Sequence, residues 1–519
     1  MSDELALLPG YALAHLQLSL LALAAGLCVS VPLGVFVARR PRLEGAVLGI
    51  AAVAQTIPSL ALLALMVPLL AALANVVASV GIELHSIGFL PAWLALALYS
   101  VLPILRNTVT GIAGVEPALI EAARGVGMTD RQRLWQVELP LALPVLVAGI
   151  RTATVWVVGT ATLATPVGAT SLGNFIFSGL QTRNFGAVVL GSVSSALLAL
   201  LLDGLIAALE RGLAARRRRL WGGAVIALAA LFTLVVATLV ASGRDLRPTV
   251  AIGAKSFTEQ YVLAALLEQT IEQAGGAEGP VVRRLDSLGS TVAFDALRSG
   301  ELDLYVDYTG TIWATILERQ GLPNDRSEVS REVRQQLAED YGIAVVAALG
   351  FENTYALAMR ADRARELQVE TVGELAARAS QLSIGGDYEF FVRAEWKALE
   401  ERYGLAFAEQ RSMDPALMYG AVRQREVDVI SAFSTDGRIA AYDLRLLEDE
   451  LGVIPPYDAI VLAGPGFQRD WAGLVAALAE LGGTIDAAAM QSMNAAVDQD
   501  GESPAAVATR FRSGIGRRN

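Results

Sequence analysis

The chain has 519 residues, which is long for one domain, and 54% of them are apolar, more than in an ordinary soluble protein. Residues 1–243 contain 14 Arg, no Lys and 10 acidic residues, whereas the remainder contains 27 Lys and Arg against 42 Asp and Glu. This division predicts one half in lipid and an acidic half in water. Neither half has the basic character expected of a nucleic-acid-binding protein.

Cysteine and histidine are scarce. Cys28 is the single cysteine, so it has no partner for an intramolecular disulfide, and the two histidines, His15 and His85, both lie in the apolar half. The acidic half therefore lacks a Ser-His-Asp or Cys-His catalytic set and a histidine metal site. We expect no enzyme and no bound metal.

Six apolar stretches in the first half are long enough to cross a hydrocarbon layer of ~30 Å at ~1.5 Å per residue. They are residues 11–38, 45–74, 89–113, 141–166, 186–209 and 220–242. Arginine clusters follow the first, third and fifth stretches, and the positive-inside rule places these loops in the cytoplasm. The clusters are Arg39, Arg40 and Arg42; Arg124, Arg131 and Arg133; and Arg211 with Arg216, Arg217, Arg218 and Arg219.

An extracytoplasmic N terminus satisfies all three clusters. Asp3 and Glu4 stand where a signal peptide has basic residues, which favours an uncleaved first span over a signal peptide. The sixth span then delivers the acidic half to the extracytoplasmic side of the membrane.

A charged, amphipathic segment, residues 116–144, lies between the third and fourth spans. It could be a solvated helical hairpin, but small residues within it allow a partner to approach closely, and Leu134, Trp135 and Val137 offer apolar contacts. Its spacing resembles the coupling loop of ABC importer permeases. The residues that carry this resemblance are Glu121, Ala122, Ala123, Gly127, Leu139 and Pro140. The resemblance implies a permease and a docking site for a cytoplasmic ABC ATPase.

No phosphate-binding loop is present in the sequence. The nearest approach is 253-GAKS-256, in which Ala254 replaces the glycine required before the lysine. We therefore expect this chain to bind no cofactor and a separate subunit to use ATP. One coupling loop per chain also predicts a homodimer, because ABC transporters use two permease halves.

Strand and helix patterns alternate from Val250 to the end of the chain, which indicates an α/β domain. Residues 296–311 align without gaps with residues 421–436, so we predict two similar lobes. An aromatic residue stands at the same strand end in each copy, Tyr308 in one and Phe433 in the other. Ligands bind outside the carboxyl ends of such strands, so both rings are expected at a shared cleft.

Tyr355 and Tyr457 each open a further alternating run, and we expect these strands to cross between the lobes. Four rings in one cleft form a cage for a methylated ammonium group. Such a cation has no N–H to donate, whereas each ring face attracts it by ~0.5–2 kcal/mol.

Several stretches of this half resemble the quaternary-amine-binding proteins of osmoprotectant ABC importers. They are 252-IGAKSFTEQ-260, 305-YVDYTGT-311, 353-NTYALAM-359, 389-EFFVR-393, 434-STDGRI-439 and 455-PPYDA-459. The resemblance implies that Tyr308, Tyr355, Phe433 and Tyr457 form the cage. It also implies that Lys255, Thr311 and Arg393 hold a substrate carboxylate, with Asn353 supporting the site through its side chain or backbone.

Alternatives remain at these positions. Lys255 could be a solvated residue at a strand end, and Arg393 could form an ion pair with Glu389 or Glu395. Phe433 stands where related sites often carry tyrosine, which leaves the identity of the solute open.

The sequence thus predicts a multi-domain chain in a bacterial-type inner membrane. Residues 1–215 form an all-α polytopic permease like those of type I ABC importers, residues 216–248 the sixth span and a linker, and residues 249–519 a two-lobed α/β domain like type II periplasmic binding proteins. The expected function is import of glycine betaine, choline, carnitine or a similar solute. An importer of ergothioneine or another amino-acid-like solute is one alternative, and a membrane-tethered solute sensor is another.

Overall fold

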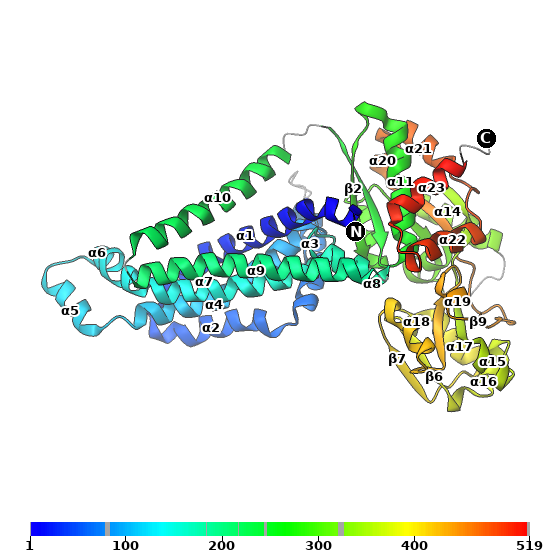
Figure 1. The fold of residues 1–519 in the computed structure, drawn as a ribbon, viewed down its shortest axis with the longest axis horizontal. Helices are drawn as coiled ribbons and strands as arrows, with labels where there is room; N and C mark the ends of the chain where they lie inside the picture. The colour runs from blue at the N-terminus through cyan, green and yellow to red at the C-terminus, as the bar shows by residue number, and fades with distance from the viewer. Residues whose placement is uncertain are drawn as a thin grey trace. The chain divides into compact units, whose positions relative to one another are not determined.

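The computed structural model describes residues 2–77, 84–182, 184–215, 217–242, 247–319 and 326–515 (Figure 1). The chain forms two compact units, a helical unit of residues 1–176 and 187–246 and an α/β unit of residues 247–519 with 177–186. Two features expected from the sequence, Arg216 and residues 243–246 of the linker, lie outside the described residues.

The helical unit contains long apolar helices that pack side by side. Its elements are α1 (Ser2–Ala38), α2 (Pro41–Thr56), α3 (Ser59–Val77), α4 (Phe89–Ala113), α5 (Pro117–Gly125), α6 (Asp130–Arg133), η2 (Leu134–Glu138), α7 (Leu139–Ala161), η3 (Thr162–Val167), α8 (Gly173–Gln181), α9 (Phe185–Ala214) and α10 (Arg218–Ser242). Helix α4 packs between α1 and α7 (Figure 1). Glycines allow this close approach: a Cβ at Gly26 would lie 1.8 Å from Ser100 Oγ, and one at Gly149 would lie 2.5 Å from Asn107 Cβ.

In the described part of the chain, five helical segments are long and apolar enough to cross a membrane, in agreement with five of the six expected spans. The remaining expected span, residues 45–74, is divided between two helices that are long and apolar enough together to cross a membrane. Helices α2 and α3 meet there at a bend of 97°. Pro58 lacks the N–H that would continue the helix, and Ile57 before it is extended, with φ −73° and ψ 128°. The second apolar stretch is therefore a bent helix pair, either a broken span or a re-entrant loop.

The α/β unit has two five-stranded sheets, one in each lobe. The first sheet has the order β2-β1-β3-β10-β4, and the second has the order β7-β6-β8-β5-β9. The strands of the first lobe are β1 (Thr249–Lys255), β2 (Val281–Leu288), β3 (Leu304–Tyr308), β4 (Ala344–Glu352) and β10 (Asp458–Ala463); those of the second are β5 (Tyr355–Arg360), β6 (Ser383–Gly386), β7 (Glu409–Ser412), β8 (Val429–Phe433) and β9 (Leu444–Leu446). Each sheet contains three parallel strands, β1, β2 and β3 in the first and β6, β7 and β8 in the second. The next strand in each sheet is antiparallel to these three: β10 in the first sheet and β5 in the second. The sequence echo thus corresponds to two lobes of equal topology.

Helices cover both sheets. They are α11 (Thr258–Gly275), η4 (Gly276–Glu278), α12 (Ser290–Ser299), α13 (Thr309–Thr311), η5 (Ile312–Ile316), α14 (Arg326–Tyr341), α15 (Ala361–Leu367), α16 (Val372–Ala376), η6 (Ala379–Gln381), η7 (Phe390–Val392), α17 (Ala394–Tyr403), α18 (Pro415–Arg423), α19 (Arg438–Ala441), α20 (Pro465–Asp470), α21 (Ala472–Ala479), α22 (Ala487–Asp498) and α23 (Pro504–Ile515). The C-terminal helices α21, α22 and α23 return to the first lobe and pack on α11, about 200 residues earlier in the chain (Figure 1).

The backbone crosses between the lobes where the sequence predicted. Asn353 and Thr354 connect β4 of the first sheet to β5 of the second, and residues 447–457 connect β9 back to β10. Tyr355, the first residue of β5, lies opposite Phe433 in the ladder with β8, and Tyr308 lies opposite Ala459 of β10. The strand ends that carry the rings therefore meet at the crossings.

The two lobes differ in how an equivalent helix ends. Gly300 after α12 has φ 79°, and Arg425 after α18 has φ 66°. Only glycine adopts this left-handed conformation without strain, so we expect Arg425→Gly to raise the free energy of unfolding by about 0.5–1 kcal/mol. The ion pair of Arg425 with Asp362 is long, 3.5 Å, and exposed, so its loss matters little. Denaturant unfolding of the full chain measures the effect. Gly300→Ala is the matched control and should lower stability, and equal losses in both variants would contradict this account.

Candidate ligand-binding site

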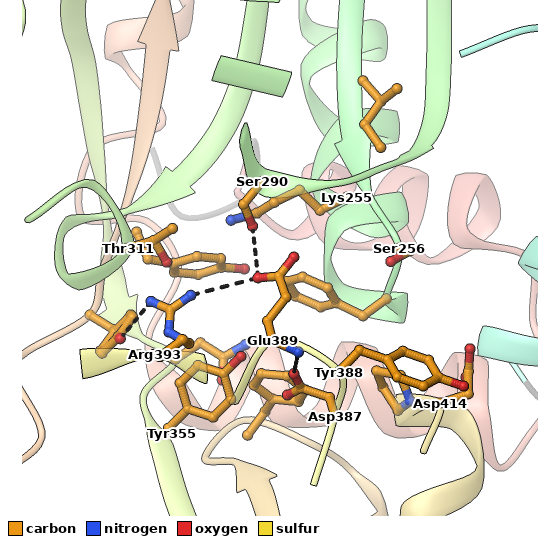
Figure 2. Close-up of a pocket in the computed structure, with 17 residues that line it drawn as sticks. Lys255, Ser256, Ser290, Thr311, Tyr355, Asp387, Tyr388, Glu389, Arg393 and Asp414 are labelled. Atoms are coloured by element: carbon orange, nitrogen blue, oxygen red, sulfur yellow. Dashed lines mark hydrogen bonds and ion pairs between the residues drawn. The ribbon is translucent and has the colours of Figure 1, made fainter. Parts of the chain in front are cut away.

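A cavity of about 190 Å³ lies between the two lobes (Figure 2). We call it the pocket. All eight residues that the sequence singled out for ligand binding line it. They are Lys255, Tyr308, Thr311, Asn353, Tyr355, Arg393, Phe433 and Tyr457. Further lining residues that the sequence did not single out include Ser256, Phe257, Ser290, Asp387, Tyr388 and Asp414.

Five aromatic rings form one continuous wall of the pocket. Phe257 stacks on Phe433 with ring centroids 5.5 Å apart and planes 8° apart, and on Tyr308 at 6.2 Å. Tyr355 contacts Phe433 at 5.0 Å and Tyr457 at 6.1 Å. Tyr388 also lines the pocket but is not part of this wall, and Phe257 is the ring of the wall that sequence reasoning missed. Its signal was its place two residues after the end of β1, inside the stretch 252–260 that carries the family resemblance.

The hydroxyls of Tyr308 and Tyr457 donate to carboxylates that do not line the pocket. Tyr308 donates to Glu259 Oε1 at 2.5 Å, and Tyr457 donates to Glu395 Oε1. Burial, with the neighbouring carboxylates, raises the pKa of Tyr308 and Tyr457 well above the usual value. Both side chains are therefore neutral phenols that offer ring faces, rather than hydroxyls, to a ligand.

Both cations of the pocket have carboxylate partners. Lys255 Nζ lies 2.6 Å from Asp307 Oδ1, and the Arg393 guanidinium lies 3.0 Å from Glu395 and 3.6 Å from Glu389. They also lie over rings, with Lys255 Nζ 4.8 Å from the Tyr308 centroid. The ion pairing of Arg393 that the sequence left open is therefore present with both neighbours. The role of these two cations toward a substrate carboxylate stays a prediction.

Glu389 connects the two lobes across the pocket. Its Oε2 accepts a hydrogen bond of 3.4 Å from Ser290, at the start of α12 in the first lobe, and lies near Arg393 in the second. Figure 2 shows the carboxylate of Glu389 between these two side chains. Such a contact has to break or rearrange when the lobes separate.

Two predicted polar residues lie at the back of the pocket. Asn353 donates from its side chain to Glu259 at 3.0 Å and from its backbone to Tyr457 O at 3.0 Å. Thr311 is buried in α13, where Gly310 packs against the ring of Tyr457. Asn353, on the segment that crosses between the lobes, is thus held by hydrogen bonds from both its side chain and its main chain.

Comparison with known proteins assigns both halves of the chain. Residues 248–513 match the family described as the substrate binding domain of the ABC-type glycine betaine transport system, and residues 30–215 match the binding-protein-dependent transport system inner membrane component. The chain belongs to this glycine betaine transport family. It is an ABC importer subunit in which a permease and a substrate-binding domain are fused, and it is a multi-pass protein of the cell membrane with its binding domain on the extracytoplasmic side.

Curated relatives agree with this division. The importer subunit is 28% identical, over 94% of its length and 87% of the relative, to the ergothioneine transport permease/ergothioneine binding protein EgtU of Helicobacter pylori (strain G27). It is 44% identical to the glycine betaine/carnitine/choline transport system permease protein OpuCB of Bacillus subtilis (strain 168), over 38% of this chain and 84% of that protein. A solved structure of a glycine betaine/carnitine/choline ABC transporter is 30% identical, covers 51% of this chain and 98% of its own, and has a TM-score of 0.45.

The segment that resembles a coupling loop forms α5, α6 and η2 of the importer subunit. Glu121, Ala122 and Gly127 are exposed, whereas Ala123 is buried against its own chain. Leu139 and Pro140 begin α7. Gly127 has φ 81°, and a Cβ added to it would meet no atom within 4 Å, so the backbone turn, rather than close packing inside the chain, requires glycine there.

Exposed apolar side chains accompany this segment. Val126 and Trp135 are 74% and 64% exposed, and Leu119 is also exposed. Beside them, Glu138 accepts bonds from Arg133 Nε at 2.6 Å and from Arg39 at 3.1 Å. The Arg39–Glu138 ion pair thus joins the segment to the residue that follows α1.

The contact between Gly310 and Tyr457 gives a stability prediction. A Cβ at Gly310 would lie 2.6 Å from the Tyr457 ring, so Gly310→Ala forces the ring from its place and should lower the free energy of unfolding by about 1–3 kcal/mol. Denaturant unfolding of the full chain measures it. Gly466→Ala in α20, where a Cβ meets open space, is the control and should leave stability unchanged or slightly raised. Equal stability of the two variants would show that the ring moves freely.

Proposed function

We propose that this importer subunit binds a quaternary-ammonium solute in the pocket between its lobes and passes it to its own helical unit. The observation that carries the proposal is the wall of five rings beside cations that are already paired with carboxylates. A trimethylammonium group presents methyls that ring faces attract, and it requires no hydrogen-bond acceptor. A relative of the permease half is named for transport of glycine betaine, carnitine and choline, which contain this group.

Ergothioneine is the second candidate solute. The relative that aligns with both halves of this chain is named as an ergothioneine transporter, and ergothioneine carries a trimethylammonium group and a carboxylate. A betaine carboxylate would compete with Glu389 for Arg393, whereas choline would leave that ion pair intact. Binding of a betaine thus requires Glu389 to give up its ion pair with Arg393, whereas binding of choline does not.

Binding by the full chain in lipid nanodiscs tests the ligand. Calorimetry with choline, glycine betaine, carnitine and ergothioneine should find at least one that binds, and Tyr355→Ala should weaken it by about tenfold or more, since one ring contributes up to ~2 kcal/mol. Tyr442→Ala removes the same side chain outside the pocket and serves as the control. Failure of all four compounds to bind the wild-type chain contradicts the proposed solute class.

We further propose that a separate cytoplasmic ATPase docks on residues 116–144 and hydrolyses ATP, so that this chain itself binds no cofactor. We also propose that two copies of the chain form the transporter. The exposed apolar side chains Leu119, Val126 and Trp135 support this docking. Docking residues are proposed as Glu121, Ala122, Ala123, Gly127, Leu139 and Pro140. A molecular mass of two chains in the purified complex is the expected result.

Uptake into vesicles that contain the chain and its ATPase tests the coupling. Gly127→Ala places a side chain at φ 81°, a strain of ~1–2 kcal/mol that distorts the turn, and should reduce ATP-dependent uptake by about tenfold while solute binding is unchanged. Gly125→Ala, two residues earlier and in ordinary helix, is the matched control. Solute binding by the wild-type chain without any ATP-dependent uptake would favour a membrane-tethered sensor instead.

A further inference from the structure

A buried carboxylate lies directly behind the ring wall. Glu259, near the start of α11, is 2% exposed and is absent from the pocket lining. Its Oε1 accepts from the Tyr308 hydroxyl at 2.5 Å and from Asn353 Nδ2 at 3.0 Å. Its Oε2 accepts from Thr435 Oγ1 at 2.5 Å and from Asn494 Nδ2 at 3.3 Å. Four donors thus surround one carboxyl group.

This set of partners favours the ionised form of Glu259, because all four hydrogen bonds are donated to the carboxyl group. The Asn494 amide nitrogen also donates to Thr435 O at 2.9 Å, which fixes its orientation, and Tyr308 receives a hydrogen bond of 3.0 Å from Gln260, which leaves its own proton for Glu259. Burial raises the pKa of Glu259, and the four hydrogen bonds oppose that rise. A proton on the carboxyl group would replace one of these four donated hydrogen bonds, because the carboxyl oxygen that carries it would become a donor.

The charge of Glu259 has no cationic partner within the described part of the chain. Asp307 pairs with Lys255 and Glu395 pairs with Arg393, but across the described residues no Lys or Arg lies within ion-pair distance of Glu259. An uncompensated buried charge is strongly destabilising. A cation placed in the neighbouring pocket would relieve this cost.

Tyr308 lies between this charge and the pocket. Its ring lines the pocket, and its hydroxyl donates to Glu259 on the other side. A hydrogen bond to an anion shifts electron density into the phenol ring, which strengthens the attraction of its face for a cation. Tyr457 has a similar bond to Glu395, but the charge of that carboxylate is already neutralised by Arg393.

We propose that Glu259 is the counter-charge of the bound cation and that, through Tyr308, it makes the pocket select cationic over neutral ligands of the same shape. The inference rests on the proposed function of the pocket. Glu259 does not touch the ligand, so it is a positioning residue that determines specificity. Asn353, Thr435 and Asn494 hold the carboxylate in place for this role.

Pairs of ligands that differ only in charge test the proposal. Choline, a cation, and neutral 3,3-dimethylbutan-1-ol form one pair, and glycine betaine, a zwitterion, and 3,3-dimethylbutanoate, an anion, form the other. A carbon replaces the ammonium nitrogen in the second member of each pair. Calorimetry on the full chain in nanodiscs gives the affinity ratio within a pair. Glu259→Gln should lower the affinity for the ammonium member of each pair by about tenfold or more, the size of one unit charge at roughly 10 Å and effective dielectric constant ~20. It should leave the affinity for 3,3-dimethylbutan-1-ol unchanged and should not lower that for 3,3-dimethylbutanoate.

Two further variants make the result decisive. Glu272→Gln makes the same change at an exposed position on the same helix and should leave the ratio unaltered. Tyr308→Phe keeps the ring and removes the hydrogen bond, so it should lower the ratio even where Glu259→Gln fails to fold. Equal losses for both members of a pair would show a purely structural role, and an unchanged ratio in both Glu259→Gln and Tyr308→Phe would overturn the proposal. If the wild-type chain binds neither choline nor glycine betaine, the proposed function itself fails first.

Discussion

The backbone of the α/β unit crosses between two sheets beside the pocket, and the position of every ring there depends on that constraint. Asn353 and Thr354 carry the chain out of the first lobe and residues 447–457 carry it back, so Tyr355 and Tyr457 stand at the points of crossing. Phe433 is opposite Tyr355 in the same ladder. A change in the angle between the lobes therefore moves these rings relative to Tyr308 and Phe257 of the first lobe, which couples closure to the shape of the site.

The charges of the site are arranged in two layers. The first layer, which lines the pocket, contains the rings, the paired cations and the carboxylates of Asp387, Glu389 and Asp414. The second layer holds the carboxylates that receive the hydroxyls of Tyr308 and Tyr457. This arrangement keeps the ring faces toward the pocket and places negative charge close behind them.

Fusion of receptor and permease changes how the solute reaches the pathway. A short linker gives a tethered domain an effective concentration in the millimolar range (~mM) at its own permease. Docking of the binding domain on the permease is then an intramolecular step and requires no diffusion of a free receptor. In the helical unit, Glu138 forms ion pairs with Arg133, in the same segment, and with Arg39, which directly follows α1. The second of these ion pairs joins residues 116–144 to the end of α1.

Local pattern was enough to predict much of this protein. Hydropathy and length predicted five of the membrane crossings, since a span in lipid has to be long, apolar and helical. The repeat of residues 296–311 at 421–436 predicted two lobes of one topology, and the alternation that ends at Tyr308 and Phe433 placed both rings at strand ends. These features follow from the order of residues along one element.

Contacts between distant elements were decided only by the tertiary structure. Proline at position 58 is visible in the sequence, but the bend of 97° between α2 and α3 is seen only in the structure. Lys255 was predicted to face a ligand carboxylate, and the fold brings Asp307 to 2.6 Å from it. Nothing in the order of residues joins Glu259 to Asn353, Thr435 and Asn494, because up to 235 residues separate these partners. The sequence thus determined the helices, the strands and the residues at their ends, whereas the packing of the lobes determined which charged groups lie next to one another.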